Sequence, residues 1–180
     1  MEIITTPIDD LWILKPKIFY DDRGYFYESY NQHVLTELGI PDIFVQDNQS
    51  CSKKGVLRGM HFQSPPHAQA KLVRVIQGSV MDVAVDIRRD SRTYGQHFSV
   101  VLSADNHWQF YLPVGFAHGF MALEDDTVFC YKCSDFYHKD SEGVLRYDDP
   151  ALAIEWPMPP VLVNEKDLRT ENFTDFKSPF

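Results

Sequence analysis

The stretch from Gly55 to Arg88 reads GVLRGMHFQSPPHAQAKLVRVIQGSVMDVAVDIR, and it decides the fold. Apolar residues alternate with other residues along most of it, as in β-strands, whose side chains point to opposite faces in turn. The charged and imidazole side chains of these segments are Arg58, His61, Lys71, Arg74, Asp82, Asp86 and Arg88. His61, Gln63 and Lys71 share a phase with Val73 and Val75, so some of these polar groups are predicted to face inward. Buried charged groups destabilise a fold unless they are paired or used, and the stretch therefore predicts a site.

Strand signals continue on both sides of this stretch, as short β-branched or aromatic segments between turn formers. The expected strands are Leu11–Phe19, Gly24–Tyr30, Phe44–Ser52, Leu72–Ile76, Val80–Asp86, His97–Leu102, Trp108–Leu112, Phe116–Leu123 and Thr127–Cys133. One short helix is expected over Asn31–Leu38, with Asn31 as its N-cap, and a helical turn within Asn164–Thr170. Many short strands at this spacing predict an all-β sandwich or barrel, and 180 residues predict one domain over residues 1–180.

Composition excludes several classes of protein. A net charge of −9 argues against a nucleic-acid surface, which needs clustered Lys and Arg. The N-terminal residues lack the pattern of a signal peptide, and no stretch approaches the roughly 18 apolar residues of a membrane helix. Cys130 and Cys133 have redox-like spacing, but residues three apart in a strand face opposite sides, so structural thiols are expected. We therefore expect a soluble, cytoplasmic protein with no membrane partner.

A second motif, Pro113-Val-Gly-Phe-Ala-His118-Gly-Phe, has the P-x-G-x-x-H form of a cupin's second motif. In many cupins this His joins two His and a Glu from the first motif around a metal. Here the first motif reads His61-Phe-Gln63, and Lys71 stands where a metal site would want an acceptor. An ammonium group is a poor neighbour for a divalent cation, so no metal site is predicted.

Together these motifs resemble the dTDP-4-dehydrorhamnose 3,5-epimerase family over nearly the whole chain. The matching segments include Asp22-Arg-Gly-Tyr-Phe-Tyr-Glu28, Gly55-Val-Leu-Arg-Gly-Met-His-Phe-Gln63, Ser91-Arg-Thr-Tyr-Gly95, Pro113–Phe120 and Lys166-Asp167. Each is weak alone, but their number and order are specific. The resemblance implies a cupin-type β-jelly roll with short flanking helices and an N-terminal strand arm. It also implies a cofactor-free isomerase that inverts C3 and C5 of dTDP-4-keto-6-deoxy-D-glucose to give dTDP-4-keto-L-rhamnose.

The chemistry of that family needs a base, a cation near the C4 oxygen, and an acid on the other side. By resemblance His61 is the base, Asp167 its partner, Lys71 the cation that stabilises the enolate, and Tyr131 the acid. Taken alone, His61 could equally be a core histidine, and core packing would be the favoured interpretation of Tyr131. The combination of these residues with Lys71 and Asp167 in family order favours the catalytic interpretation.

The resemblance also implies substrate-binding residues and a partner subunit. The binding positions are Arg23, Glu28, Gln46, Asn48, Arg58, His118, Glu142 and Lys166. In the family, Arg23 and Glu28 reach the neighbouring subunit's pocket from an N-terminal arm, which predicts a homodimer with exchanged strands. Alternatively, Arg23 is a solvated turn residue. Tyr137 and Phe19 are candidates to stack on thymine, with core packing as the alternative.

Two other functions remain open from the sequence. A relative could invert C3 alone, in a 3-epimerase of a dTDP-4-keto-6-deoxyhexose, or act as a 3,4-ketoisomerase. A cupin-like module could bind a sugar nucleotide without turnover. The presence of both a base and an acid argues against a pure binding module, since binding alone requires neither.

Overall fold

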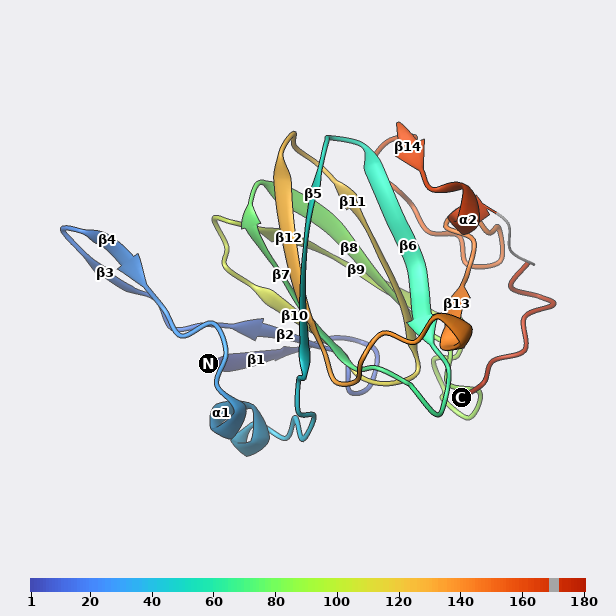
Figure 1. The fold of residues 1–180 in the computed structure, drawn as a ribbon, viewed down its shortest axis with the longest axis horizontal. Coiled ribbons are helices and arrows are strands. Elements are labelled where there is room, and N and C mark those ends of the chain that lie inside the picture. The colour runs from blue at the N-terminus through green and yellow to red at the C-terminus, as the bar shows by residue number, and fades with distance from the viewer. Residues whose placement is uncertain (169–171) are drawn as a thin grey trace.

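The structure, a computed structural model, describes residues 1–168 and 172–180, and it consists of two β-sheets that face each other (Figure 1). The first sheet has the strand order β1 (Glu2–Thr5), β2 (Trp12–Lys15), β10 (Gln109–Leu112), β7 (Lys71–Gln77), β12 (Thr127–Cys133) and β5 (Gln46–Ser52). The second has the order β13 (Glu142–Val144), β6 (Val56–Gln63), β11 (Phe116–Ala122), β8 (Ser79–Asp86) and β9 (His97–Ser103), with β14 (Leu162–Val163) parallel to β6. This is the predicted cupin-type β-jelly roll.

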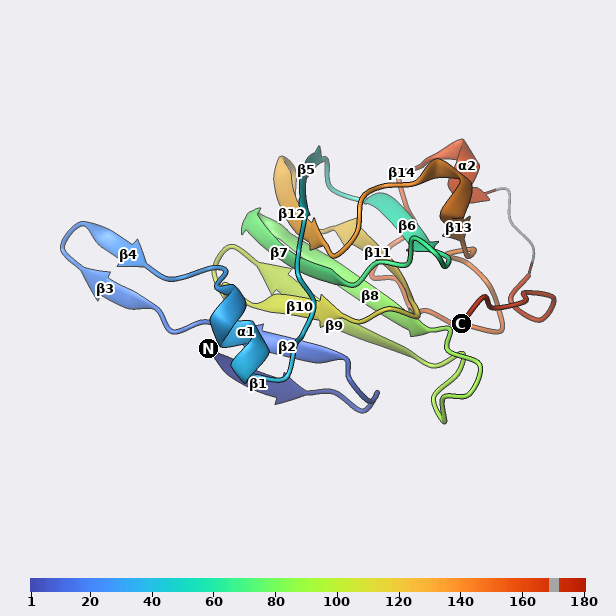
Figure 2. The same cartoon turned by 60° about the horizontal axis from the view of Figure 1, so that its bottom comes forward.

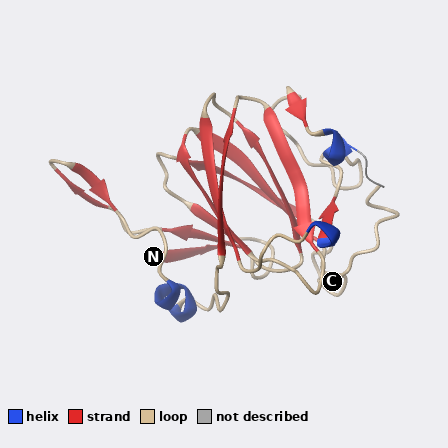
Figure 3. Cartoon of the chain, in the orientation of Figure 1, coloured by secondary structure: helices blue, strands red, loops and turns tan. Residues whose placement is uncertain are grey.

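Three short helical elements and one hairpin complete the described part of the chain (Figure 3). The helical elements are α1 (Gln32–Glu37), the 3₁₀ turn η1 (Lys139–Ser141) and α2 (Glu165–Leu168), and the hairpin pairs β3 (Phe19–Asp21) with β4 (Gly24–Phe26). The hairpin projects away from the two sheets in both views (Figures 1 and 2). In the described ranges, no helix has the length and apolar character of a membrane span.

Local sequence explains where most elements begin and end. Asn31 caps α1, because its Oδ1 accepts hydrogen bonds from the amides of His33 and Val34 at 3.0 and 3.4 Å. Gly39, with φ of +90°, follows the helix in a conformation that glycine adopts readily. The strand expected over Leu11–Phe19 is shorter, because β2 ends before Pro16, which has no amide hydrogen for the ladder.

Other boundaries differ from the predictions in detail. The strand expected over Gly24–Tyr30 ends at Phe26 in β4, and the one expected from Phe44 begins at Gln46 in β5. The helical turn expected within Asn164–Thr170 is α2, and Thr170 lies outside the described residues. No local pattern predicted β1, β13 and β14, which are two to four residues long and depend on a neighbouring strand.

Apolar side chains fill three layers. Between the sheets, Val73 and Phe110 of the first sheet pack in one buried cluster with Ala84 and Phe120 of the second. On the outer face of the first sheet, Leu35 of α1 is fully buried in a second cluster. Burying such a side chain contributes about 1.5–3 kcal/mol.

The outer face of the second sheet is covered by the C-terminal segment, which lies beside β6 in Figures 1 and 2. Phe62 of β6 contacts the rings of Phe176 and Phe180, with centroids 5.7 and 6.1 Å away. The second sheet is therefore packed on both faces, and β6 is held between the interior and this segment.

An irregularity in β6 places two functional candidates on the same face. His118 of β11 pairs with His61 of β6, and Phe120 of β11 pairs with Arg58 of β6. Two residues of β11 therefore span the same distance as three residues of β6. The additional residue of β6 forms a bulge, so Arg58 and His61 both line the interior although residues three apart alternate in a regular strand. Gly59 has φ of +127°, and a Cβ there would lie 2.4 Å from the Cα of Gly119. The two glycines therefore let the backbones of β6 and β11 approach closely at the bulge.

We predict that Gly59→Ala destabilises the fold strongly. A side chain at this positive φ costs about 1–3 kcal/mol, and overpacking against backbone adds about 1–3 kcal/mol. Gly24→Ala is a matched control, because Gly24 has φ of +125° but a Cβ added there would have nothing within 4 Å. Denaturant unfolding should show a clearly larger loss for Gly59→Ala, and equal losses in the two variants would contradict the close approach.

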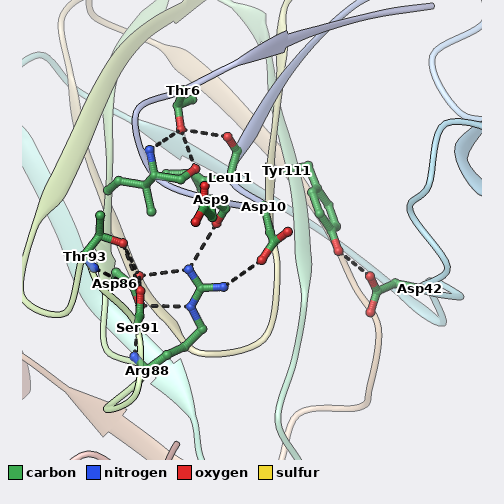
Figure 4. Close-up of polar contacts among 11 residues, drawn as sticks. Thr6, Asp9, Asp10, Leu11, Asp42, Asp86, Arg88, Ser91, Thr93 and Tyr111 are labelled. Carbon is green, nitrogen blue, oxygen red and sulfur yellow. Dashed lines mark hydrogen bonds and ion pairs between the residues drawn. The ribbon is translucent and has the colours of Figure 1, made fainter.

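A charged network centred on the buried Asp86 ties the end of β8 to the turn between β1 and β2 (Figure 4). Asp86 has no exposed surface and accepts hydrogen bonds from Arg88, Ser91 and Thr93 at 2.6–3.0 Å. Arg88 also donates to Asp10 Oδ2 at 3.0 Å. Burial alone would raise the pKa of Asp86, but these hydrogen bonds outweigh it and hold the pKa below its usual range.

We predict that Asp86→Asn lowers the free energy of unfolding at pH 7 by about 3 kcal/mol, because it breaks a buried pair. A carboxylate with a depressed folded pKa stabilises the fold above its unfolded pKa of about 3.9, and this contribution is lost as pH falls through the folded pKa. Unfolding of the wild type should therefore show a loss of stability in this acid range that the variant lacks. Asp148→Asn, at an exposed pair with Arg146, is the control and should change stability much less. An Asp86→Asn variant as stable as wild type at pH 7 would contradict the network's role.

Candidate active site

A cavity of about 330 Å³ opens between the two sheets, at the end not filled by the apolar core. Most of the predicted site residues line it: His61, Lys71, Tyr131, Asp167, Gln46, Asn48, Arg58, His118, Glu142 and Lys166. They come from β5, β6, β7, β11, β12, β13 and α2, so the fold gathers positions up to 121 residues apart, from Gln46 to Asp167. Of the predicted residues, Arg23 and Glu28 do not line it.

His61 and Asp167 form a hydrogen-bonded pair at the cavity. Nε2 of His61 lies 2.8 Å from Oδ1 of Asp167, and the Asp167 side chain is only 2% exposed. Asn164 holds the start of α2, because its Oδ1 accepts from the amide of Lys166 at 3.1 Å and its main-chain oxygen accepts from the amide of Asp167. An imidazole fixed at Nε2 presents its other nitrogen in a defined direction.

Lys71 and Tyr131 face His61 from the opposite sheet. Lys71 of β7 reaches across to donate a hydrogen bond to the main-chain oxygen of His61 at 3.2 Å. Burial lowers the pKa of Lys71, and the nearby Cys133 and Asp82 only partly oppose this shift. Burial raises the pKa of Tyr131, so its phenol stays protonated near neutral pH and is available as a proton donor.

A second imidazole–carboxylate pair joins His118, which lines the cavity, to the fully buried Asp82. His118 Nε2 is 2.9 Å from Oδ1 of Asp82, and both side chains are almost completely buried. Burial lowers the pKa of His118 and raises the pKa of Asp82, so the environment favours a neutral imidazole.

Charged groups surround the mouth of the cavity. Lys166 Nζ donates to Glu142 Oε1 at 2.8 Å, and the hydroxyl of Tyr137 lies 3.4 Å from Glu142 Oε2. Burial by itself would lower the pKa of Lys166, but the bond to Glu142 outweighs it and raises the pKa. Arg58 donates to Ser52 Oγ at 3.1 Å and borders the same opening. Arg58 and Lys166 thus provide positive charge for an anion at the mouth.

Arg23 and Glu28 lie apart from this cavity. Arg23 is at the tip of the β3–β4 hairpin with 90% of its side chain exposed, and it pairs with Asp21 of the same turn at 2.5 Å. Glu28 is also exposed, just after the hairpin. Neither residue lines the cavity described above, so their predicted binding roles have no support within a single chain.

Several cavity residues were not predicted as functional. Phe120 and Phe129 stack at a centroid distance of 4.0 Å and line its floor, next to Tyr131. Cys133 borders the cavity and accepts a hydrogen bond from Asn48 Nδ2 at 3.7 Å. Their period-two phase with Tyr131 in β12 was the signal that could have found Phe129 and Cys133.

Cys130 and Cys133 are both free thiols on β12. In the part of the chain that the structure describes, no three His, Cys, Asp or Glu side chains converge as metal ligands would.

Comparison with known proteins identifies related sequences and structures. The family model described as dTDP-4-dehydrorhamnose 3,5-epimerase matches residues 5–175. A protein of that name from Shigella flexneri is 49% identical over 176 residues, covering 97% of each chain.

Solved structures agree. The crystal structure of a dTDP-6-deoxy-D-glucose-3,5-epimerase from Legionella pneumophila, in complex with dTDP-4-keto-L-rhamnose, is 50% identical with a TM-score of 0.94, covering 98% of this chain and 94% of that one. A 3'-monoepimerase from Streptomyces bikiniensis, in complex with dTDP-quinovose, is 30% identical with a TM-score of 0.87, covering 93% and 85%. The chain therefore belongs to the dTDP-4-dehydrorhamnose 3,5-epimerase family.

Proposed function

We propose that this protein is a dTDP-4-dehydrorhamnose 3,5-epimerase, which converts dTDP-4-keto-6-deoxy-D-glucose into dTDP-4-keto-L-rhamnose. The observation that carries the proposal is the arrangement of one cavity. The His61–Asp167 pair stands on the side of one sheet, and Lys71 and Tyr131 come from the other. A base and an acid on opposed walls suit removal of a proton from one face of a sugar and its return to the other.

His61 is the proposed base. With Nε2 bonded to Asp167, the lone pair on Nδ1 accepts the proton from the carbon next to the C4 ketone. The C–H electrons move into a C=C bond and the carbonyl electrons onto O4, which gives an enolate. Asp167 stabilises the imidazolium that forms and keeps the ring in place.

Lys71 and Tyr131 complete the proposed cycle. The Lys71 ammonium stabilises the negative charge on O4, which is strongest in the enolate and the transition state that precedes it. Tyr131 then donates its phenolic proton to the carbon from the opposite side, and the ketone re-forms with inverted configuration. The imidazolium of His61 then loses its proton to water, and the Tyr131 phenolate takes one up from water. Because C3 and C5 both flank C4, the reset groups serve the second centre after the sugar shifts.

The remaining charged groups suit the nucleotide half of the substrate. Arg58 and Lys166 at the mouth fit the diphosphate, because guanidinium and ammonium groups donate to its oxygens. Gln46, Asn48, His118 and Glu142 complete the proposed substrate contacts, and Tyr137 offers a flat face at the rim for the base.

The function is tested by product analysis. After incubation with dTDP-4-keto-6-deoxy-D-glucose, the keto sugar is reduced with borohydride, hydrolysed and identified. Rhamnose and 6-deoxytalose report inversion at C3 and C5. 6-Deoxyallose and 6-deoxygulose would report inversion at C3 alone and contradict the double epimerisation, and unchanged substrate in a folded protein would contradict catalysis.

We further propose a homodimer in which the β3–β4 hairpin completes the partner's cavity. The hairpin exposes four large rings, since Phe19, Tyr20, Tyr25 and Phe26 are 53–72% exposed. Contiguous exposed rings of this kind are typical of an interaction surface. An arm that buries them against a second copy would also bring Arg23 to a place where its charge meets the diphosphate.

Mixing two inactive variants tests the exchange. Arg23→Ala and His61→Ala should each be impaired, but in a mixed dimer one cavity combines an intact His61 with an intact arm from the partner. Half of a random mixture is mixed dimer and half of its cavities work, so about one quarter of wild-type activity should return after co-expression. If each arm served its own cavity, no activity would return.

We also propose a cytoplasmic location. Its support is that Cys51, Cys130 and Cys133 are all free thiols, as is usual in a reducing compartment.

A further inference from the structure

The segment Ser134–His138, here called the rim loop, carries Tyr137 at the mouth of the cavity. Phe136 and Tyr137 are 64% and 55% exposed, so few apolar contacts hold the loop. A connection with so little buried surface is expected to be mobile unless its backbone is held by hydrogen bonds. Polar contacts must therefore set the position of the Tyr137 ring.

Three glutamine side chains make these contacts. Gln69 Nε2 donates to the main-chain oxygen of Asp135 at 2.7 Å. Gln63 Nε2 donates to the oxygen of Phe136 at 3.2 Å, and Gln63 Oε1 accepts from the amide of His138 at 2.6 Å. Gln46 Oε1 accepts from the amide of Tyr137 at 2.9 Å. Consecutive residues of the loop are thus each held by an amide side chain from β5, β6 or the segment before β7.

Gln63 is the central member of this set. It is 5% exposed, and its second amide hydrogen is donated to the oxygen of His67 at 2.7 Å. Both of its donors and its acceptor are therefore satisfied by backbone. Gln63 is two residues from His61 in β6, so its hydrogen bonds fix the rim loop to the strand that carries the proposed base. The rings of His67 and His138 stack with their centroids 3.9 Å apart, which joins the connection between β6 and β7 to the rim loop.

We propose that Gln63 and Gln69 are positioning residues for nucleotide recognition: they fix the rim loop, and thereby the place where the Tyr137 ring meets the nucleotide base. This rests on the proposed function, since it assigns the base of the dTDP-sugar to Tyr137. The two glutamines act on binding of the nucleotide, whereas the proton transfers belong to residues deeper in the cavity. In this proposal Gln63 affects nucleotide affinity through backbone contacts alone, because its two donors and its acceptor are all bonded within the protein.

The test uses Gln63→Met, which keeps the side-chain length but removes all three hydrogen bonds. Calorimetry with dTDP should show about tenfold weaker binding, corresponding to about 1.4 kcal/mol. KM for the sugar nucleotide should rise by a similar factor while kcat stays within about threefold. Gln69→Met, which loses one bond, should show a smaller effect in the same direction. Gln32→Met is the matched control, because Gln32 Nε2 donates to the main-chain oxygen of Asp42 in the same way but far from the cavity.

A double-mutant cycle separates positioning from direct contact. In a Tyr137→Ala background, Gln63→Met should weaken dTDP binding by less than about twofold, because the ring it positions is gone. Amide hydrogen exchange in the ligand-free protein should also become faster at His138 in Gln63→Met.

Two results would overturn the inference alone: an unchanged dTDP affinity in Gln63→Met, or a full tenfold loss that persists without Tyr137. Failure of the wild-type protein to bind dTDP would instead overturn the proposed function together with the inference.

Discussion

His61→Ala is expected to lower kcat by about 10²–10⁴-fold, the usual contribution of a general base. Dissociation of dTDP should change little, because the proposed nucleotide contacts lie at the mouth while His61 stands beside Asp167. Truncation of His61 leaves Asp167 without its partner but removes no positive charge from the mouth. Steady-state kinetics and dTDP calorimetry on the same preparation measure the two effects separately.

His33→Ala is the matched control for this variant, because His33 is exposed on α1, outside the cavity. It should retain wild-type kcat and dTDP affinity. Near-wild-type turnover in His61→Ala would remove the base from the mechanism. A loss that appears only as weaker dTDP binding would make His61 a binding residue.

Lys71→Met is expected to lower kcat by about 10²–10³-fold, the loss typical when one preorganised group that stabilises an oxyanion is removed. Methionine keeps much of the side-chain length, so the loss reports the ammonium charge. Lys132→Met is the control: Lys132 lies on the adjacent strand β12, one residue after Tyr131, and pairs with Asp47 at 2.9 Å. It should retain activity, and an effect of Lys71→Met confined to KM would show that Lys71 only binds.

The pKa of Lys71 adds a pH test to this prediction. Burial lowers the pKa of Lys71, so its charge is lost at a lower pH than the usual value of about 10.4. Burial raises the pKa of Tyr131, so the phenol titrates above its usual range. The alkaline fall in wild-type kcat should therefore follow Lys71, and it should be absent from the residual activity of Lys71→Met. An alkaline limb that persists there would belong to another group.

The sequence predicted the fold well because strand signals are local. Alternation through β7 and β8 indicated their faces, and Asn31 marked the start of α1. Period two also indicated the interior phase of Lys71, Val73 and Val75. Boundaries near prolines and the two-to-four-residue strands were not predicted, since such strands exist only through pairing with neighbours.

The site was predicted through resemblance more than through pattern. Regular alternation places Arg58 and His61 on opposite faces, and only the bulge at Gly59 brings both to the cavity. Asp167 is 106 residues from His61, so no local signal joins them. The roles of Gln63 and Gln69 were missed because the sequence gives no sign of which backbone groups a polar side chain will bind.

Arg23 and Glu28 could not be placed at the site from the sequence for a different reason. Their sequence motif resembles the family's, yet a single chain holds them away from the cavity. Their proposed role depends on a second subunit, which a local pattern cannot specify. The complementation of Arg23→Ala by His61→Ala addresses this part of the account directly.

Proton NMR of the wild-type protein with dTDP-4-keto-6-deoxy-D-glucose in D₂O tests the central claim most directly, because proton abstraction beside the ketone exchanges the carbon-bound hydrogens with solvent. The account predicts that deuterium enters at both C3 and C5, and that His61→Ala abolishes this exchange. Deuterium at C3 alone would contradict the double epimerisation, and no exchange at either carbon with substrate bound would contradict the proposed chemistry altogether.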